Sequence, residues 1–291
     1  MTFDPFKSFM KTRLLTLFLI SSCCLHAAAR ADEGAAAAAP ADASPQAFTG
    51  NVGFVSDYRF RGISQTWKRP AVQAGFDYSH GSGLYVGTWA SNVSGNSYNN
   101  GAGMEWDLYG GYKLAVADGV TLDVGALAYV YPGARLNAAP GQPTGNKYDN
   151  VDVYAAVSAG AFSAKLSVAA TDYFGLDSTT AGYAYFNALP ARGSSRGTAY
   201  LDLNYGFELG QGVNAGLHLG HLWVRKYGDL SYTDWKLSLS KAVKDLGGLT
   251  FSVALVGTDA DRALYQAGDA AGQRARRLGD TGVVLGVSRA F

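Results

Sequence analysis

From Asn51 to Phe291 the sequence repeatedly alternates apolar and polar residues. A period of two places successive side chains on opposite faces of a β-strand. About ten residues is the length that a tilted strand needs to cross a lipid bilayer. About twelve segments of roughly this length show the alternation: NVGFVSDYRF, VQAGFDY, LYVGTWASNV, MEWDLYGGY, VTLDVGALAYVY, VDVYAAVSA, FSAKLSVAA, AYLDLNYGF, VNAGLHLGHLW, DWKLSLS, LTFSVALVG and VVLGVSRAF.

The connections between these segments alternate between short and long. HGSG, VADG and LGQG are short, whereas the stretches 132–147, 175–196 and 259–279 are long. An up-and-down barrel with both termini on one side of a membrane has this asymmetry. A soluble sandwich would have to hide the aromatic faces of all the strands in one core, whereas lipid accepts them directly. The sequence therefore predicts an all-β fold, a transmembrane up-and-down antiparallel β-barrel of about 12 strands, over residues 48–291.

Composition and charge agree with this fold. Glycine accounts for 37 of 291 residues and charged residues for only 16%, against about 7% and 25% in typical globular proteins. Residues 1–31 hold four of the 24 basic residues and one of the 23 acidic residues, so 20 basic and 22 acidic residues remain, a net charge of −2. A chain with this balance has no polybasic patch, and we expect no nucleic-acid partner.

Residues 1–31 have the pattern of a signal peptide, with Met10 as an alternative start. Lys11 and Arg13 precede the apolar run LLTLFLISSCCL, which is shorter than the ~20 residues of a membrane-spanning helix. The sequence Ala29-Arg30-Ala31 supplies small residues at the positions that a signal peptidase recognises. We expect export to the outer membrane of a Gram-negative bacterium.

Both cysteines, Cys23 and Cys24, lie within this signal segment. Cleavage after residue 31 would leave no thiol for a disulfide, a zinc site or a nucleophile. The alternative is a lipoprotein, because ISSC resembles a lipoprotein cleavage box with Cys23 as the acylated residue. The alanine-rich stretch 32–47 is expected to be a flexible leader.

The final segment ends on Phe291. In a closed barrel the last strand pairs with the first, so no strand edge is left unpaired. Counting back in twos places Val283, Leu285 and Val287 with Phe291 on the lipid face. Arg289 shares this face, at an interface position where the cost is about 0 to 1 kcal/mol. We expect Phe291 to lie in the periplasmic aromatic girdle and to act as the C-terminal signal for the barrel-assembly machinery.

The polar faces of the strands supply candidate pore-lining residues. An unpaired ion in a dry core would cost more than the whole stability of a fold, so the lumen is expected to be wet or densely salt-bridged. Twelve strands lie between the filled barrels of about eight strands and the open channels of 16 to 18. The candidates are Asp57, Arg59, Arg61, Asp77, Glu105, Asp107, Lys113, Asp123, Asp152, Lys165, Asp202 and Lys236.

The stretch SDYRFRGISQ aligns Asp57, Arg59 and Arg61 in one row if the first strand continues through it. One hypothesis is a charged constriction that selects small ions. The other is that the arginines bind facing carboxylates such as Asp77 or Glu105 and hold the wall in shape. The segment 174–196 either folds inward and narrows the pore or forms an external loop.

Enzymatic motifs do not fit the strand pattern, and neither a cofactor nor a metal is expected. His218 and His221 are three residues apart, which places them on opposite faces of a strand, one towards the lumen and one towards the belt. SLSK (238–241) has a serine–lysine hydrolase spacing, but that chemistry needs a helix. Two function classes remain: a porin-like channel for small hydrophilic solutes or ions, and a non-conducting structural or adhesive barrel with a salt-bridged interior. Nothing in the sequence indicates a subunit contact face.

The stretches VSDYRFRGISQ, PAVQAGFDY and GLYVGTWASNV, together with the final phenylalanine, resemble the TorF family of proteobacterial porins. The resemblance is strongest from Asn51 to Val93 and continues more loosely to Phe291. It implies an outer-membrane β-barrel with a passive transport role, without defining the solute. Arg289 departs from the pattern, because such barrels often carry an apolar or aromatic residue there.

Overall fold

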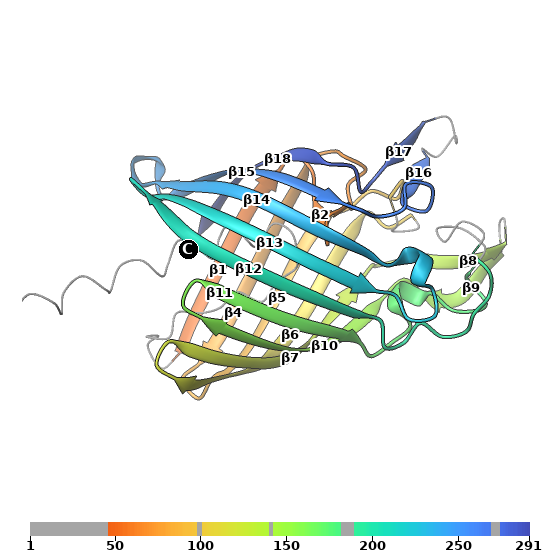
Figure 1. Cartoon of the computed structure of the whole chain (residues 1–291), viewed down its shortest axis with the longest axis horizontal. Helices are drawn as coiled ribbons and strands as arrows, with labels where there is room; N and C mark the ends of the chain where they lie inside the picture. Colours follow the sequence, from red (N-terminus) through yellow and green to blue (C-terminus); the bar gives the residue numbers. More distant parts are fainter. Residues whose placement is uncertain (1–45, 98–100, 140–141, 182–188, 269–273) are drawn as a thin grey trace, which may run out of the picture.

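The computed structural model of the chain describes residues 46–97, 101–139, 142–181, 189–268 and 274–291. Twelve antiparallel strands close into one barrel, as Figure 1 shows, which confirms the predicted fold class. The wall strands are β1 (Gln46–Val55), β4 (Ala71–His80), β5 (Leu84–Asn92), β6 (Met104–Ala117), β7 (Val120–Val130), β10 (Asn150–Ala159), β11 (Phe162–Ala169), β12 (Ala199–Gly210), β13 (Val213–Trp223), β14 (Tyr232–Val243), β15 (Leu249–Thr258) and β18 (Gly282–Ala290).

The remaining elements lie in the connections. Three two-stranded hairpins are formed by β2 (Arg59–Phe60) with β3 (Ile63–Ser64), β8 (Arg135–Ala139) with β9 (Gln142–Lys147), and β16 (Gln266–Gly268) with β17 (Ala275–Arg277). Short 3-10 helices are η2 (Tyr173–Gly175), η4 (Gly228–Leu230) and η5 (Lys244–Leu246). No helix within the described ranges is long and apolar enough to cross a membrane.

The two ends of the barrel differ. At one end, turns of two to five residues join β4 to β5, β6 to β7, β10 to β11, β12 to β13, and β14 to β15. The long connections, with their hairpins, gather at the opposite end (Figure 1). Gln46 pairs with His80, the last residue before the short turn from β4 to β5. The C-terminus, marked in Figure 1, lies at this end too. This is the predicted arrangement. We call the end with the long connections the loop end and the other the turn end.

The seam between β1 and β18 closes the barrel. Asn51 lies opposite Ala290, and Phe54 opposite Val287. Beyond the strand, Phe291 exchanges two backbone hydrogen bonds with Gly50, at 2.7 and 2.9 Å. The last strand therefore pairs with the first, as predicted, and neither leaves an open edge.

The wall separates apolar from polar side chains. In β14, Leu237 and Leu239 are exposed by 50% and 44%, whereas Lys236, Ser238 and Ser240 between and beside them are buried. Large apolar residues are exposed in the same alternating way on the other wall strands, including Phe76, Val86, Leu108 and Leu285. In a closed barrel the alternate positions that are not on this outer surface face the interior. The barrel thus has an apolar exterior and a polar lumen.

One predicted boundary is wrong. The first alternating segment was expected to continue through Phe60, but β1 ends at Val55 and the chain then turns into the barrel. Apolar and polar residues still alternate in this stretch, but the chain has left the wall. Its polar groups bind partners within the stretch instead of lining the wall. Tyr58 and Phe60, which the pattern assigns to the lipid face, are buried with the rest of the infolded segment.

Candidate functional site: the lumen and its infolded hairpin

The segment Ser56–Trp67, which we call the infolded hairpin, is buried inside the barrel at the loop end, with Ser56 itself half-buried. Its two short strands, β2 and β3, join through Arg61 and Gly62, which both adopt positive φ angles of 49° and 76°. A positive φ in a residue other than glycine is uncommon and requires support from its surroundings. The contacts of Arg61 supply that support.

Asp57 organises the base of the hairpin. Its carboxylate accepts hydrogen bonds from Arg59 Nε at 2.6 Å, from the Ser64 hydroxyl at 2.6 Å and from the Thr66 hydroxyl at 3.1 Å. These bonds join both strands of the hairpin to one charge. They explain why the chain forms a local hairpin here rather than a longer wall strand.

Arg61 connects the hairpin to the opposite wall. Its guanidinium donates to Asp152 on β10 at 2.9 Å, and only 2% and 3% of the two side chains is exposed. It also lies over the rings of Tyr200, at 4.3 Å from the centroid, and Phe60, at 4.7 Å. A charge-assisted hydrogen bond and cation–π contacts with two rings are both favourable interactions, and together they hold the Arg61 side chain in place.

A second link involves Glu105 on β6. Its carboxylate accepts one hydrogen bond from the Tyr58 hydroxyl and another from the Tyr131 hydroxyl, both at 2.8 Å. Burial, followed by the nearby Glu105 charge, raises the pKa of Tyr58 well above its usual value. The phenol is therefore protonated at neutral pH and serves as a donor.

The third link ties the hairpin to the connection between β15 and β18. Arg59 donates to the backbone carbonyls of Leu278 and Asp280 at 3.1 Å. The indole of Trp67 donates to the carbonyl of Ala267 at 3.0 Å, and Arg276 donates to the carbonyl of Trp67 at 2.7 Å. The hairpin is thus held on three sides and occupies part of the lumen at the loop end.

Towards the turn end the lumen is more open. Tyr85 donates to Asp123 at 2.7 Å and also contacts the Tyr154 hydroxyl. Lys113 lies 4.7 Å from the centre of the Tyr85 ring, and Lys165 lies 5.8 Å from that of Tyr154. All five side chains belong to residues that face the lumen, and Lys113, Asp123, Tyr154 and Lys165 are only partly buried. Charged side chains here are in contact with solvent.

His218 lies in a cluster of polar side chains on the wall formed by β12, β13 and β14. His218 contacts Asp202 through Nδ1 at 3.0 Å and Asp234 through Nε2 at 2.7 Å, and the Tyr200 hydroxyl donates to Asp234 at 3.0 Å. Asp234 was not among the predicted lumen residues, although it stands two residues before Lys236 and so faces the same way. His221 faces outward against the Trp223 ring at 4.4 Å, so the two histidines lie on opposite faces, as predicted.

Asp107 differs from its neighbours. Its side chain is fully buried on the inner face of β6, and no hydrogen-bond donor within the described ranges reaches either carboxylate oxygen. Trp89 on β5 and Tyr129 on β7 are opposite it in the sheet. A buried carboxylate without a partner is strongly destabilising unless something else compensates it.

The structure distributes the twelve candidate residues between wall and hairpin. Nine lie on the inner face of wall strands. Asp57, Arg59 and Arg61 lie on the infolded hairpin rather than in a row on the wall, which corrects that prediction. The arginines do bind carboxylates, but these are Asp57 and Asp152 rather than Asp77 or Glu105.

Part of the segment 174–196 also lies inside the barrel. Phe174 and Leu176 are buried, and the Phe174 ring packs against Phe60 at 5.8 Å and Tyr129 at 5.5 Å. Residues 182–188 of this segment lie outside the described residues. Across the described part of the chain, no group of three or more His, Cys, Asp or Glu residues is placed to hold a metal ion.

The chain matches one protein-family model and is similar to several solved structures. A family model named Gcw_chp, described as a bacterial protein of unknown function, matches residues 38–291. Among solved structures, the chain is similar to the KdgM porin in complex with disordered oligogalacturonate (TM-score 0.43, 9% identity, 84% of this chain and 99% of that chain). Others are the NanC porin (0.44, 10%, 84% and 98%) and OpdL of Pseudomonas aeruginosa (0.36, 16%, 84% and 67%). No curated protein matches the chain.

Proposed function

This chain belongs to the Gcw_chp family of bacterial proteins, and we propose that it is an outer-membrane porin-like channel through which small hydrophilic solutes or ions diffuse passively. The observation that carries this proposal is the separation of side chains by the closed wall. Large apolar residues cover the outside, while charged residues from seven wall strands face the inside.

The exterior supports a place in a lipid bilayer. Phe76, Val86, Leu219 and Leu285 are each exposed by more than half, and an apolar surface of this extent is unfavourable in water. The paired wall leaves no open strand edge to lipid, which is the condition for a sheet to span a membrane.

The interior supports a water-filled path. Lys113, Asp123 and Lys165 are partly exposed towards the lumen at the turn end, and charged groups of this kind remain favourable only with water or ionic partners. At the loop end the infolded hairpin narrows the path. We therefore propose a narrow channel that excludes large solutes, with the hairpin as its constriction.

A non-conducting structural or adhesive barrel is the second candidate. The buried Arg61–Asp152 ion pair and the fully buried Tyr58 favour it, because they show a lumen packed tightly at the loop end. The two candidates share one fold and one location, so only a transport measurement separates them.

Single-channel recording in a planar lipid bilayer is that measurement. Purified, refolded protein is expected to give discrete conductance steps that are smaller than those of open 16-stranded porins. A folded barrel that gives no steps over long recordings would support the closed alternative. An equal amount of heat-unfolded protein controls for leakage through the lipid.

We further propose that residues 1–31 direct export, that residues 32–47 form a leader before the barrel domain 48–291, and that the protein resides in the Gram-negative outer membrane. The final strand, with Phe291, would be recognised by the barrel-assembly machinery. The resemblance of the first strands to the TorF family of porins supports this assignment, since Val55–Gln65 carries its central stretch. Fractionation of cells that express the full chain tests the location.

A further inference from the structure

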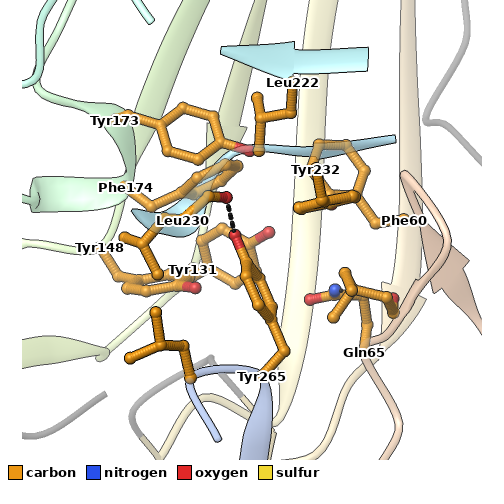
Figure 2. A pocket seen from close by; sticks show the side chains of 12 residues that line it. Phe60, Gln65, Tyr131, Tyr148, Tyr173, Phe174, Leu222, Leu230, Tyr232 and Tyr265 are labelled. Atoms are coloured by element: carbon orange, nitrogen blue, oxygen red, sulfur yellow. Dashed lines mark hydrogen bonds between the residues drawn. The ribbon is translucent and has the colours of Figure 1, made fainter. Parts of the chain in front are cut away.

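A pocket lies at the loop end, between the infolded hairpin and the long connections (Figure 2). It contains about 570 Å³ of empty space, part of which is continuous with solvent. The pocket is therefore partly open at the loop end rather than an enclosed cavity. The lining residues are Phe60, Ile63, Gln65, Tyr131, Tyr148, Tyr173, Phe174, Leu222, Leu230, Tyr232, Leu264 and Tyr265.

The chemistry of the lining selects an uncharged ligand. Seven of the twelve residues are aromatic, four are aliphatic and one is an amide; none is ionised at neutral pH. This contrasts with other parts of the lumen, where charged side chains such as Asp123, Lys165 and Lys236 face inward. A charged ligand would lose its hydration here without gaining an opposite charge in direct contact.

The polar groups of the lining are largely engaged with each other or with the wall. The Tyr265 hydroxyl donates to the carbonyl of Leu230, the dashed bond in Figure 2, and the Gln65 amide donates to the carbonyl of Ile63 at 3.0 Å. The Tyr131 hydroxyl donates to Glu105. A sugar with four or five hydroxyl groups would therefore leave several of them without partners.

The rings are arranged to receive another ring. Tyr131 and Tyr148 pack edge to face with centroids 4.8 Å apart, and so do Tyr232 and Tyr265 at 5.0 Å. In Figure 2, Tyr148 and Phe174 lie on one side of Tyr265, and Tyr232 on the other. Edge-to-face contacts use both the faces and the edges of aromatic rings, so a flat ring can join this arrangement.

The backbone at the pocket is also unusual. Phe174, which contacts four of the surrounding aromatic rings, has a φ angle of 46°. A bulky residue in the left-handed region is strained, and such strain concentrates at binding sites. The ring contacts maintain this backbone conformation and keep the Phe174 ring in the wall of the pocket.

From these observations we propose that the pocket binds a small uncharged aromatic compound that carries one or two hydrogen-bonding groups, such as a simple phenol. This inference goes beyond passive diffusion and does not depend on it, because binding is measured on folded barrels in detergent without any transport.

The test is titration calorimetry of the folded full chain with p-cresol, with protein-free micelles as the baseline. We expect saturable one-site binding of p-cresol, and binding at least ten times weaker for benzoate, which adds a charge, and for glucose, which adds hydroxyl groups. Absence of saturable p-cresol binding, or tighter binding of glucose or benzoate, overturns the proposal.

A matched pair of variants on β13 locates the site. Leu222→Trp fills the pocket, whereas Leu219→Trp places the same ring on the outer surface, where Leu219 is 51% exposed. Leu222→Trp should weaken p-cresol binding at least tenfold and Leu219→Trp should leave it unchanged. If Leu222→Trp does not fold, Leu264→Trp fills the pocket from the connection after β15. Wild-type affinity in a folded pocket-filling variant refutes the assignment.

Discussion

Arg61 is the residue whose removal should have the largest effect on the packed hairpin. Its ion pair with Asp152 is almost completely buried, and breaking a buried pair by removing one partner costs about 3 to 5 kcal/mol. Access of water to the lumen should reduce this, so we expect Arg61→Ala to lower the free energy of unfolding by about 2 to 3 kcal/mol. Urea titration of folded protein in lipid vesicles measures it.

The control for this prediction is the double variant Arg61→Ala/Asp152→Ala, which leaves no uncompensated charge and should recover part of the loss. Lys68→Ala is a second control, because Lys68 pairs with Asp280 only at 4.0 Å with both side chains about one-third exposed, and such a pair contributes at most about 1 kcal/mol. Equal losses for Arg61→Ala and Lys68→Ala would contradict the proposed role of the buried pair.

Asp107 and Glu105 should respond in opposite directions to replacement of their carboxyl groups by amides. Asp107→Asn replaces a buried carboxyl group that has no donor among the described residues. Folding of this variant no longer requires a carboxylate to be buried or protonated, so we expect the free energy of unfolding at neutral pH to rise by about 1 kcal/mol or more. Glu105→Gln weakens two hydrogen bonds from tyrosines and should lower it by about 1 to 3 kcal/mol. The same urea titration compares the two, and destabilisation by Asp107→Asn would show that the carboxylate has a stabilising partner.

At the scale of elements, the infolded hairpin should control the width of the path. Replacing residues 57–66 with a short Gly-Ser linker removes its contacts with Glu105, Asp152 and Leu278 while leaving β1 and β4 intact. Single-channel conductance should at least double. Pro132→Gly, at an exposed position of another loop-end connection, is the control and should leave conductance unchanged. An unaltered conductance in the hairpin variant would place the constriction elsewhere.

The wall strands could be predicted from the sequence, whereas the infolded hairpin could not. All twelve wall strands were predictable, because lipid outside and polar groups inside impose a period of two on every strand. The hairpin was not, because DYRF also alternates, and only the three bonds that Asp57 accepts distinguish a local hairpin from a longer strand. The pairing of Arg61 with Asp152 could not be predicted from the alternation either, because the two residues are 91 positions apart in the sequence.

For the whole molecule, the seam between the first and last strands determines closure. The Phe291 ring covers Gly50, where any added side chain would collide with it, and packs on Phe76 at 6.3 Å. Phe291→Ala should lower the free energy of unfolding by about 1 kcal/mol, the value of one aromatic pair, and reduce the folded fraction on refolding into vesicles. Phe291→Tyr keeps the ring and should behave as the wild type. A normal folded yield for Phe291→Ala would show that backbone pairing alone closes the barrel.

The contacts at the seam also fix an order of events. Ser56, where the hairpin leaves the wall, exchanges hydrogen bonds with Leu285 on the last strand, 229 residues later in the chain. Contacts between such distant positions form late, because the intervening chain must first be brought together. A partly assembled sheet without its final strand offers the hairpin no such anchor. We therefore expect the hairpin to reach its final position only when the last strand is in place, so that the interior of a nascent barrel is less obstructed than that of the finished one.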